Sequence, residues 1–224
     1  MGRFLRFNSL SLFFFALFAA TIVAESIVGW HLYNEEAQQH MSEQIGYLRY
    51  LYSSDFGAAV LENWQSEWLQ FCLFVLATVW FLQEGSPESK ELDKAGLESD
   101  DDQKVGDHVA AGSPLWARVG GLRTRVYENS LLIAFGLIFL GSWLAQAATG
   151  WTEYNDLQEE HDDPKIGFLT YVTRPDFWDR TLQNWQSEFL AVGTMAVLAI
   201  YLRQRGSPES KPVGAAHDAT GQTG

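Results

Sequence analysis

Two copies of one polar run hold the side chains that could do chemistry in this chain. Asn-Trp-Gln-Ser-Glu stands at residues 63–67 and again at residues 184–188. On a helix, the Asn and the Glu of each run are four residues apart and share one face. If the two copies lie side by side, Glu67 and Glu188 approach each other, and a pair of carboxylates can hold a proton or a cation.

Further polar residues are expected at the same depth of a membrane. Glu25 in the first copy and Gln146 in the second occupy matching places. A carboxylate in hydrocarbon costs free energy unless it is protonated, paired or hydrated, so it normally faces the interior of a helix bundle. The predicted intramembrane polar cluster comprises Glu25, Asn63, Glu67, Gln70, Gln146, Asn184 and Glu188.

Two interpretations of this cluster stay open. In the first, the amide and hydroxyl side chains bond across helices and set their register, each bond contributing about 0.6 kcal/mol. In the second, the carboxylates handle protons or cations near the outer surface. The first is favoured, because the stretches 71–81 and 192–201 offer little polarity beyond Thr78 and Thr194, and a path inward would be dry.

Two histidines at matching places, His40 and His161, invite a metal hypothesis because acidic residues lie near both. The acids do not match between the copies, since Asp162 stands where the first copy has Met41. We therefore expect ordinary loop hydrogen bonds from both histidines, with no metal and no cofactor. The chain has no nucleophile and base at a recognisable spacing, so it is not expected to be an enzyme.

A tandem repeat must position these residues. Residues 8–90 align without a gap with residues 129–211, and 31 of the 83 positions are identical. Apolar stretches of about 18–20 residues can cross roughly 30 Å of hydrocarbon as helices. The sequence predicts an all-α membrane protein with four transmembrane helices, formed by a parallel tandem repeat of two-helix units. The helices are expected at about 10–30, 63–82, 131–149 and 184–202.

The basic residues predict the orientation of these helices. Most of the 15 Lys and Arg residues lie in the N-terminal, central and C-terminal segments. The positive-inside rule then places both termini and the central linker in the cytoplasm, as in a multi-pass protein of a bacterial inner (plasma) membrane. The first apolar stretch resembles a signal peptide, but we expect it to be retained, because its second copy lies in mid-chain.

The composition divides the chain into four segments and excludes some classes of protein. With a net charge of −13 and no basic face, the chain is not expected to bind nucleic acid. Its single cysteine excludes a disulfide within the chain. The predicted segments are a first repeat at 1–90, an acidic disordered linker at 91–115, a second repeat at 116–211 and a disordered tail at 212–224.

Aromatic residues mark the outer membrane boundary. Trp side chains prefer this interface, because the ring is apolar while its N–H needs a polar partner. The predicted interfacial anchors are Trp30, Trp64, Trp151 and Trp185. The second helix of each repeat is expected to begin outside the hydrocarbon, near Ser54 and Arg174. Thr173 and Asp176 indicate a capping box at the latter start.

Gly-Ser-Pro-Glu-Ser-Lys closes both repeats, at residues 85–90 and 206–211. Gly is expected to end the helix, and Pro two residues later prevents its continuation. Six identical residues exceed what a stop requires. The alternatives are a paired docking site for a cytoplasmic protein partner or a loop that folds back on the inner helix ends. A homo-oligomer is a further expectation.

These motifs together give the chain a family resemblance. Gly-Trp, Tyr-Asn, Asp-Phe and the two long runs resemble an uncharacterised family of bacterial membrane proteins, a domain of unknown function, over residues 3–211. The resemblance implies four helices in an inner membrane and carries no activity. The expected function is a non-enzymatic envelope scaffold or partner-binding module. The alternative is a small proton- or cation-coupled transporter or channel that uses the outer carboxylates.

Overall fold

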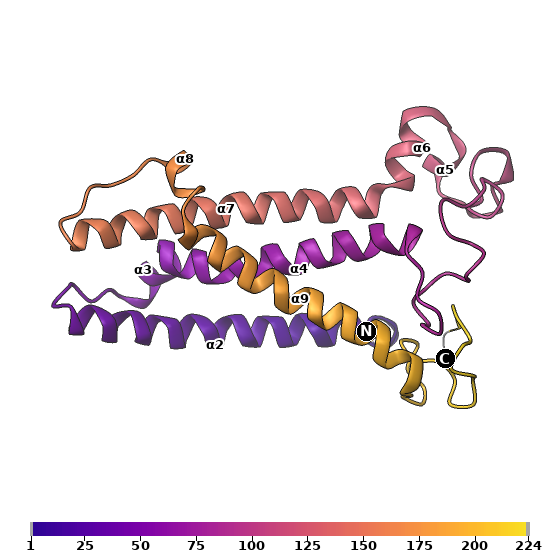
Figure 1. The fold of residues 1–224 in the computed structure, drawn as a ribbon, viewed down its shortest axis with the longest axis horizontal. Coiled ribbons are helices and arrows are strands. Elements are labelled where there is room, and N and C mark those ends of the chain that lie inside the picture. The colour runs from indigo at the N-terminus through magenta and orange to yellow at the C-terminus, as the bar shows by residue number, and fades with distance from the viewer. Residues whose placement is uncertain (1, 223–224) are drawn as a thin grey trace. The chain divides into compact units, whose positions relative to one another are not determined.

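Helices dominate the computed structural model, which describes residues 2–222 and contains no strand among them. The predicted all-α class is therefore confirmed. Met1 and the last two residues of the predicted tail lie outside the described residues. The long helices are α2 (Ser9–Gln39), α4 (Ser54–Trp80), α7 (Ser130–Glu160) and α9 (Pro175–Tyr201) (Figure 1). The short ones are α1 (Gly2–Phe7), α3 (Tyr47–Leu51), η1 (Gly106–His108), α5 (Leu115–Arg118), α6 (Gly121–Glu128) and α8 (Phe168–Tyr171).

The chain forms two compact units that each draw on both repeats. The first unit contains Met1–Val60 and Ala148–Ile166, and the second contains Leu61–Ala147 and Gly167–Gly224. Helices α4 and α7 each begin in one unit and end in the other. The polar runs at 63–67 and 184–188 both belong to the second unit, so their mutual geometry is given within a single body.

Two helices, α2 and α7, are long and apolar enough to cross a membrane. Their most apolar stretches are only 6% and 17% buried, respectively. A core helix of a soluble protein would bury such a stretch, because exposed apolar area costs about 25 cal/mol per Å² in water. For α4 and α9, crossing a membrane stays a prediction, as does the orientation of the termini.

The second helix of each repeat begins where we expected, at Ser54 for α4 and at Pro175 for α9. The capping box expected at the latter start is wrong. Arg174 is the N-cap residue without a side-chain cap bond, and the Thr173 hydroxyl donates backward to the Thr170 carbonyl at 2.7 Å. Pro175 removes one N–H that would need a cap and presets a helical φ, so the helix starts without the box.

A side-chain clamp in the first unit fixes the loop that follows α2. The Trp30 indole N–H donates to the Ile45 carbonyl at 2.7 Å. The Asn34 side chain brackets the same residue: its amide donates to the Ile45 carbonyl at 3.1 Å, and its oxygen accepts from the Ile45 N–H at 2.8 Å. The chain reversal after α2 is therefore held by two residues of the helix itself.

The second copy repeats this clamp bond for bond after α7. Trp151 donates to the Ile166 carbonyl at 2.8 Å, and Asn155 bonds both polar atoms of the Ile166 backbone at 3.1 and 2.8 Å. The repeated Gly-Trp, Tyr-Asn and Ile-Gly motifs thus have a structural cause. The Trp N–H groups bond to protein carbonyls here, and their placement at a membrane interface stays a prediction.

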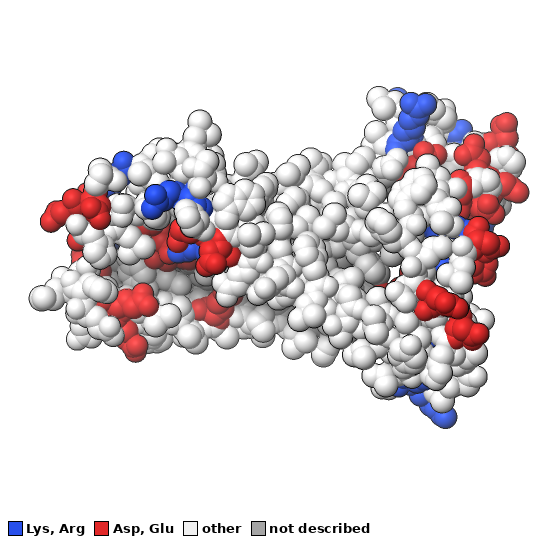
Figure 2. Space-filling view, in the orientation of Figure 1, with Lys and Arg blue, Asp and Glu red and all other residues white. Residues whose placement is uncertain are grey.

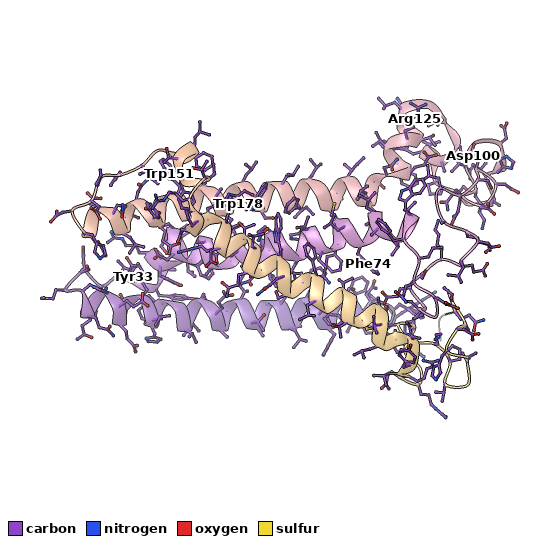
Figure 3. All side chains as sticks on the ribbon, in the orientation of Figure 1. Tyr33, Phe74, Asp100, Arg125, Trp151 and Trp178 are labelled. Atoms are coloured by element: carbon purple, nitrogen blue, oxygen red, sulfur yellow. The ribbon has the colours of Figure 1, made fainter. Side chains whose placement is uncertain are left out.

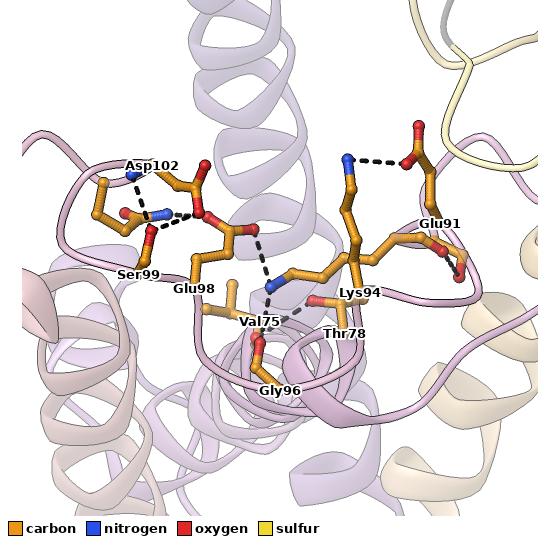
Figure 4. Close-up of polar contacts among 11 residues, drawn as sticks. Val75, Thr78, Glu91, Lys94, Gly96, Glu98, Ser99 and Asp102 are labelled. Atoms are coloured by element: carbon orange, nitrogen blue, oxygen red, sulfur yellow. Dashed lines mark hydrogen bonds and ion pairs between the residues drawn. The ribbon is translucent and has the colours of Figure 1, made fainter.

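Charged side chains gather over the connections between helices on the face drawn in Figure 2, and the helical surface between them is uncharged. In the linker, Lys94 pairs with Glu91 at 2.8 Å and Ser99 donates to Asp102 at 2.6 Å (Figure 4). Such exposed pairs are screened by water and contribute little to stability. They are too weak to order residues 91–115 by themselves, and the disorder of this segment stays a prediction.

Candidate functional site

The polar run of the first repeat joins α4 to α9 within the second unit. Gln65 is fully buried, and its side-chain oxygen accepts from the Trp185 indole N–H at 2.7 Å. The Gln65 amide donates to the Glu62 carbonyl at 3.0 Å, and the Glu62 carboxylate pairs with Arg180 at 3.0 Å. These contacts link residues about 120 positions apart in sequence, and they give part of each run a structural role.

The Gln65 contact leads to a prediction with a control inside the chain. Gln65→Leu removes the acceptor of the half-buried Trp185 indole N–H, which should cost about 1 kcal/mol. Gln186 is the twin of Gln65 in the second run and is exposed, so Gln186→Leu should change stability by about 0.5 kcal/mol or less. Thermal unfolding of both variants in detergent measures the difference. Equal losses would show that the bond contributes nothing specific.

The predicted polar cluster is divided by the structure. Glu67 and Glu188 lie close enough for their charges to interact, with Glu67 exposed and Glu188 half-buried. Asn184 donates to the Arg180 carbonyl of its own helix at 2.8 Å. Gln146 is buried on α7. Glu25 lies exposed on α2 in the first unit, whereas the other predicted members, including Asn63 and Gln70, belong to the second.

A cavity of about 400 Å³ lies between α4 and α9. Its walls are apolar apart from one amide and two carboxyl groups. They consist of Gln70, Phe71, Phe74, Ala191, Val192 and Met195 from the helices, with Glu88 and Glu209 from the two loops (Phe74 is labelled in Figure 3). Pockets of 300–1,000 Å³ with few polar groups are typical of small-ligand sites.

Glu88 and Glu209 are site residues that sequence reasoning missed. They occupy the same place in the two Gly-Ser-Pro-Glu-Ser-Lys loops, and both line the cavity, close enough for the charge of Glu209 to act on Glu88. We had explained these loops by Gly, Pro and Lys alone. An acid repeated at the same position was the available sign, although only the fold brings the two copies together.

The pKa of Glu88 is raised above its ordinary value, first by burial and second by the charge of Glu209. Above pH 4.5, the ordinary value, the folded chain then holds more protons than the unfolded chain, so stability falls as pH rises until the folded pKa is passed. Glu88→Gln should therefore flatten the decline of the thermal midpoint above this pH. Glu209→Gln should flatten it only in part, because burial remains.

The helix ends before the Gly of each closing loop, so our expectation that Gly ends it is wrong. Helix α4 ends at Trp80 and α9 at Tyr201, ahead of Gly85 and Gly206. After the helix ends, a serine hydroxyl accepts a hydrogen bond from a backbone N–H and so holds the chain in a turn. In the first loop the Gln83 N–H donates to the Ser89 hydroxyl at 2.9 Å. The backbone therefore leaves the helical conformation before the glycine.

Both loops have the same internal structure. The Gln204 N–H donates to the Ser210 hydroxyl at 2.9 Å, as the equivalent pair does in the first loop. Gly85 has φ +82° and Gly206 has φ +84°, a left-handed conformation that glycine adopts at little cost. The six-residue identity therefore encodes a folded loop. This agrees with the fold-back alternative, and binding of a partner stays open.

Lys211 is the only one of the two loop lysines that lies fully inside the protein, with 1% of its surface exposed. Its ammonium donates to the carbonyls of Ala216, His217 and Ala219 at 3.1, 2.8 and 3.1 Å. The lysine thus fixes the position of the C-terminal segment, residues 212–222. Burial and, after it, the charge of Arg203 lower the pKa of Lys211, whereas the charge of Asp218 acts in the opposite direction.

The two histidines of the metal hypothesis, His40 and His161, lie in the first unit. The His161 ring nitrogen Nδ1 lies 2.7 Å from the Leu157 carbonyl, and His40 is exposed at the end of α2. Within residues 2–222, no group of three or more His, Cys, Asp or Glu side chains is placed to hold a metal ion. Of the predicted anchors in the second unit, Trp185 bonds Gln65 and Trp64 is half-buried.

Comparison with known proteins gives a family without an assigned activity. A family model described as a domain of unknown function, DUF6766, matches residues 1–222. No curated protein and no solved structure matches the chain.

Proposed function

The chain belongs to the DUF6766 family, a domain of unknown function, and we propose that it is a four-helix protein of the bacterial inner membrane that acts as a non-enzymatic, partner-binding scaffold. The exposed apolar surface of α2 and α7 carries this proposal, because a lipid phase is the natural cover for it. The positive-inside distribution supports cytoplasmic termini.

The use of the repeated motifs supports a scaffold. The Trp and Asn residues of the outer motifs clamp the loops after α2 and α7. Gln65 and Trp185 join α4 to α9. The serines of the closing loops fold those loops. These members of the repeated motifs are thus engaged in holding the protein together, which fits a protein that works by presenting surfaces.

Reporter fusions and affinity capture test this proposal. A periplasm-active reporter after residue 45 and after residue 165 should give activity, and a cytoplasm-active one after residue 105 should do so too. A reversed result at any position removes the four-span arrangement. Capture of the tagged chain from native membranes should retain specific proteins. The same proteins should be absent when membranes that lack the chain are treated with the same detergent. Recovery of the chain alone would contradict a scaffold.

A second candidate function is proton- or cation-coupled transport. It is favoured by two observations. The cavity between α4 and α9 has Glu88 and Glu209 in its wall, and the charges of Glu67 and Glu188 interact about one turn away from Gln70 and Ala191. Reconstituted liposomes with a pH or cation gradient should then show flux. Glu67→Gln with Glu188→Gln should abolish it, and flux that persists in this double variant removes those acids from the mechanism.

A further inference from the structure

The two closing loops are alike in sequence and fold but differ in what covers them. In the first loop Gly85, Ser86, Pro87 and Ser89 are buried. In the second loop Gly206, Pro208 and Glu209 are exposed. Internal bonds and backbone angles agree between the loops, so the difference arises from a neighbour at the Gly-Ser end that the first loop has and the second lacks.

The neighbour of the first loop is the chain's own C-terminal segment. The Gly85 N–H donates to the Thr220 hydroxyl at 2.9 Å, and the Gly221 N–H donates to the Ser86 carbonyl at 3.0 Å. The His217 carbonyl lies so close to Gly85 that a Cβ there would be 2.3 Å from it. The loop therefore binds a short peptide through its backbone, and the bare Gly permits the approach.

The second loop presents an open hollow where its twin is filled. A cavity of about 320 Å³ is bounded by Gln204, Arg205, Gly206, Lys211, Pro212 and Val213. One C-terminal segment cannot cover two loops, and Lys211 and the first loop already hold it. Arg205 stands where the first loop has Glu84, so the second loop suits an acidic occupant better than the first does.

We propose that the loop at residues 206–211 is a peptide-docking site for a cytoplasmic partner protein. Its ligand is a short segment with the chemistry of His217–Gly221: small residues, a hydroxyl acceptor for the Gly206 N–H, a backbone N–H for the Ser207 carbonyl and a carboxylate for Arg205. This inference rests on the proposed scaffold function and names the surface and the partner chemistry that the scaffold would use.

A synthetic peptide of residues 214–222 is the probe. With the full chain in nanodiscs, fluorescence anisotropy of the labelled peptide should show saturable binding to one site per chain. Gly206→Ala should weaken binding at least tenfold, because the added methyl would meet the docked backbone as it would in the twin loop. Arg205→Glu should weaken it in a salt-dependent way, and a peptide with Thr220 replaced by Val should bind less tightly.

Gly141→Ala is the matched control, since a Cβ at this helical glycine meets nothing within 4 Å and lies away from the loop. Circular dichroism and elution as a single species establish that each variant is folded. Binding that is unsaturable, or equal in Gly206→Ala and Gly141→Ala, overturns the docking site. If the peptide fails to bind while the tagged chain still captures partners from native membranes, the docking site is wrong and the scaffold function stands.

Discussion

Gly85→Ala should lower the free energy of unfolding by about 3 kcal/mol. The substitution has two costs. A non-Gly residue at φ +82° costs about 1–2 kcal/mol, because its Cβ crowds the following carbonyl. The new Cβ would also lie 2.3 Å from the His217 carbonyl and 2.9 Å from an Ile200 methyl carbon, which forces the C-terminal segment off the loop. Overpacking of this kind costs about 1–3 kcal/mol.

Gly206→Ala separates these two costs. Gly206 has φ +84°, nearly the same as Gly85, and a Cβ there meets nothing within 4 Å. It should therefore lose only the backbone contribution, about 1–2 kcal/mol. Hydrogen exchange should show faster exchange at Gly221 in Gly85→Ala and no change there in Gly206→Ala. Equal losses of stability with unchanged exchange in both variants would mean that the C-terminal segment does not rest on the first loop.

The helical elements follow from local properties that a sequence displays. The lengths of the apolar stretches predicted long helices, and the starts expected near Ser54 and Arg174 agree with those of α4 and α9. These properties act over a few residues and need no knowledge of the fold. The helix ends were less accurate, because Ser89 and Ser210 draw the chain out of the helix before Gly is reached.

The site depended on contacts that no local pattern contains. Glu88 meets Glu209, and Gln65 meets Trp185, across a sequence separation of about 120 residues. The repeat indicated that equivalent residues could meet, and the charges of the equivalent residues Glu67 and Glu188 do interact. It could not indicate that the C-terminal segment covers the Gly-Ser end of one loop only, because that asymmetry comes from a segment outside the repeat.

Lys211→Met should cost about 3 kcal/mol and release the C-terminal segment. Met keeps the length of the side chain but has no donor, so the carbonyls of Ala216, His217 and Ala219 lose their shared partner. A hydrogen bond to a charged group is worth about 1.5–3 kcal/mol, and the total is less than three such bonds because exposed carbonyls regain water. Thermal unfolding gives the cost, and hydrogen exchange over residues 214–221 reports the release.

Lys90→Met is the control from the other repeat. Its ammonium donates to the Gly96 carbonyl at 2.9 Å and pairs with Glu98 at 3.0 Å, and both side chains remain partly exposed. The expected cost is about 1 kcal/mol, with exchange in residues 214–221 unchanged. If both lysine variants lose the same stability, the three carbonyls around Lys211 contribute no more than a surface contact does.

Combining Lys211→Met with Gly85→Ala tests whether both substitutions act on one segment. Lys211 gathers the carbonyls of residues 216–219, and Gly85 receives Thr220 from the same segment. Once Lys211→Met has released the segment, the Cβ of Ala at position 85 has nothing left to displace and only the backbone cost remains. The double variant should therefore lose about 1–2 kcal/mol less than the sum of the single losses. Strict additivity would mean that the lysine and the first loop hold separate structures, and the first loop would then be no template for its open twin.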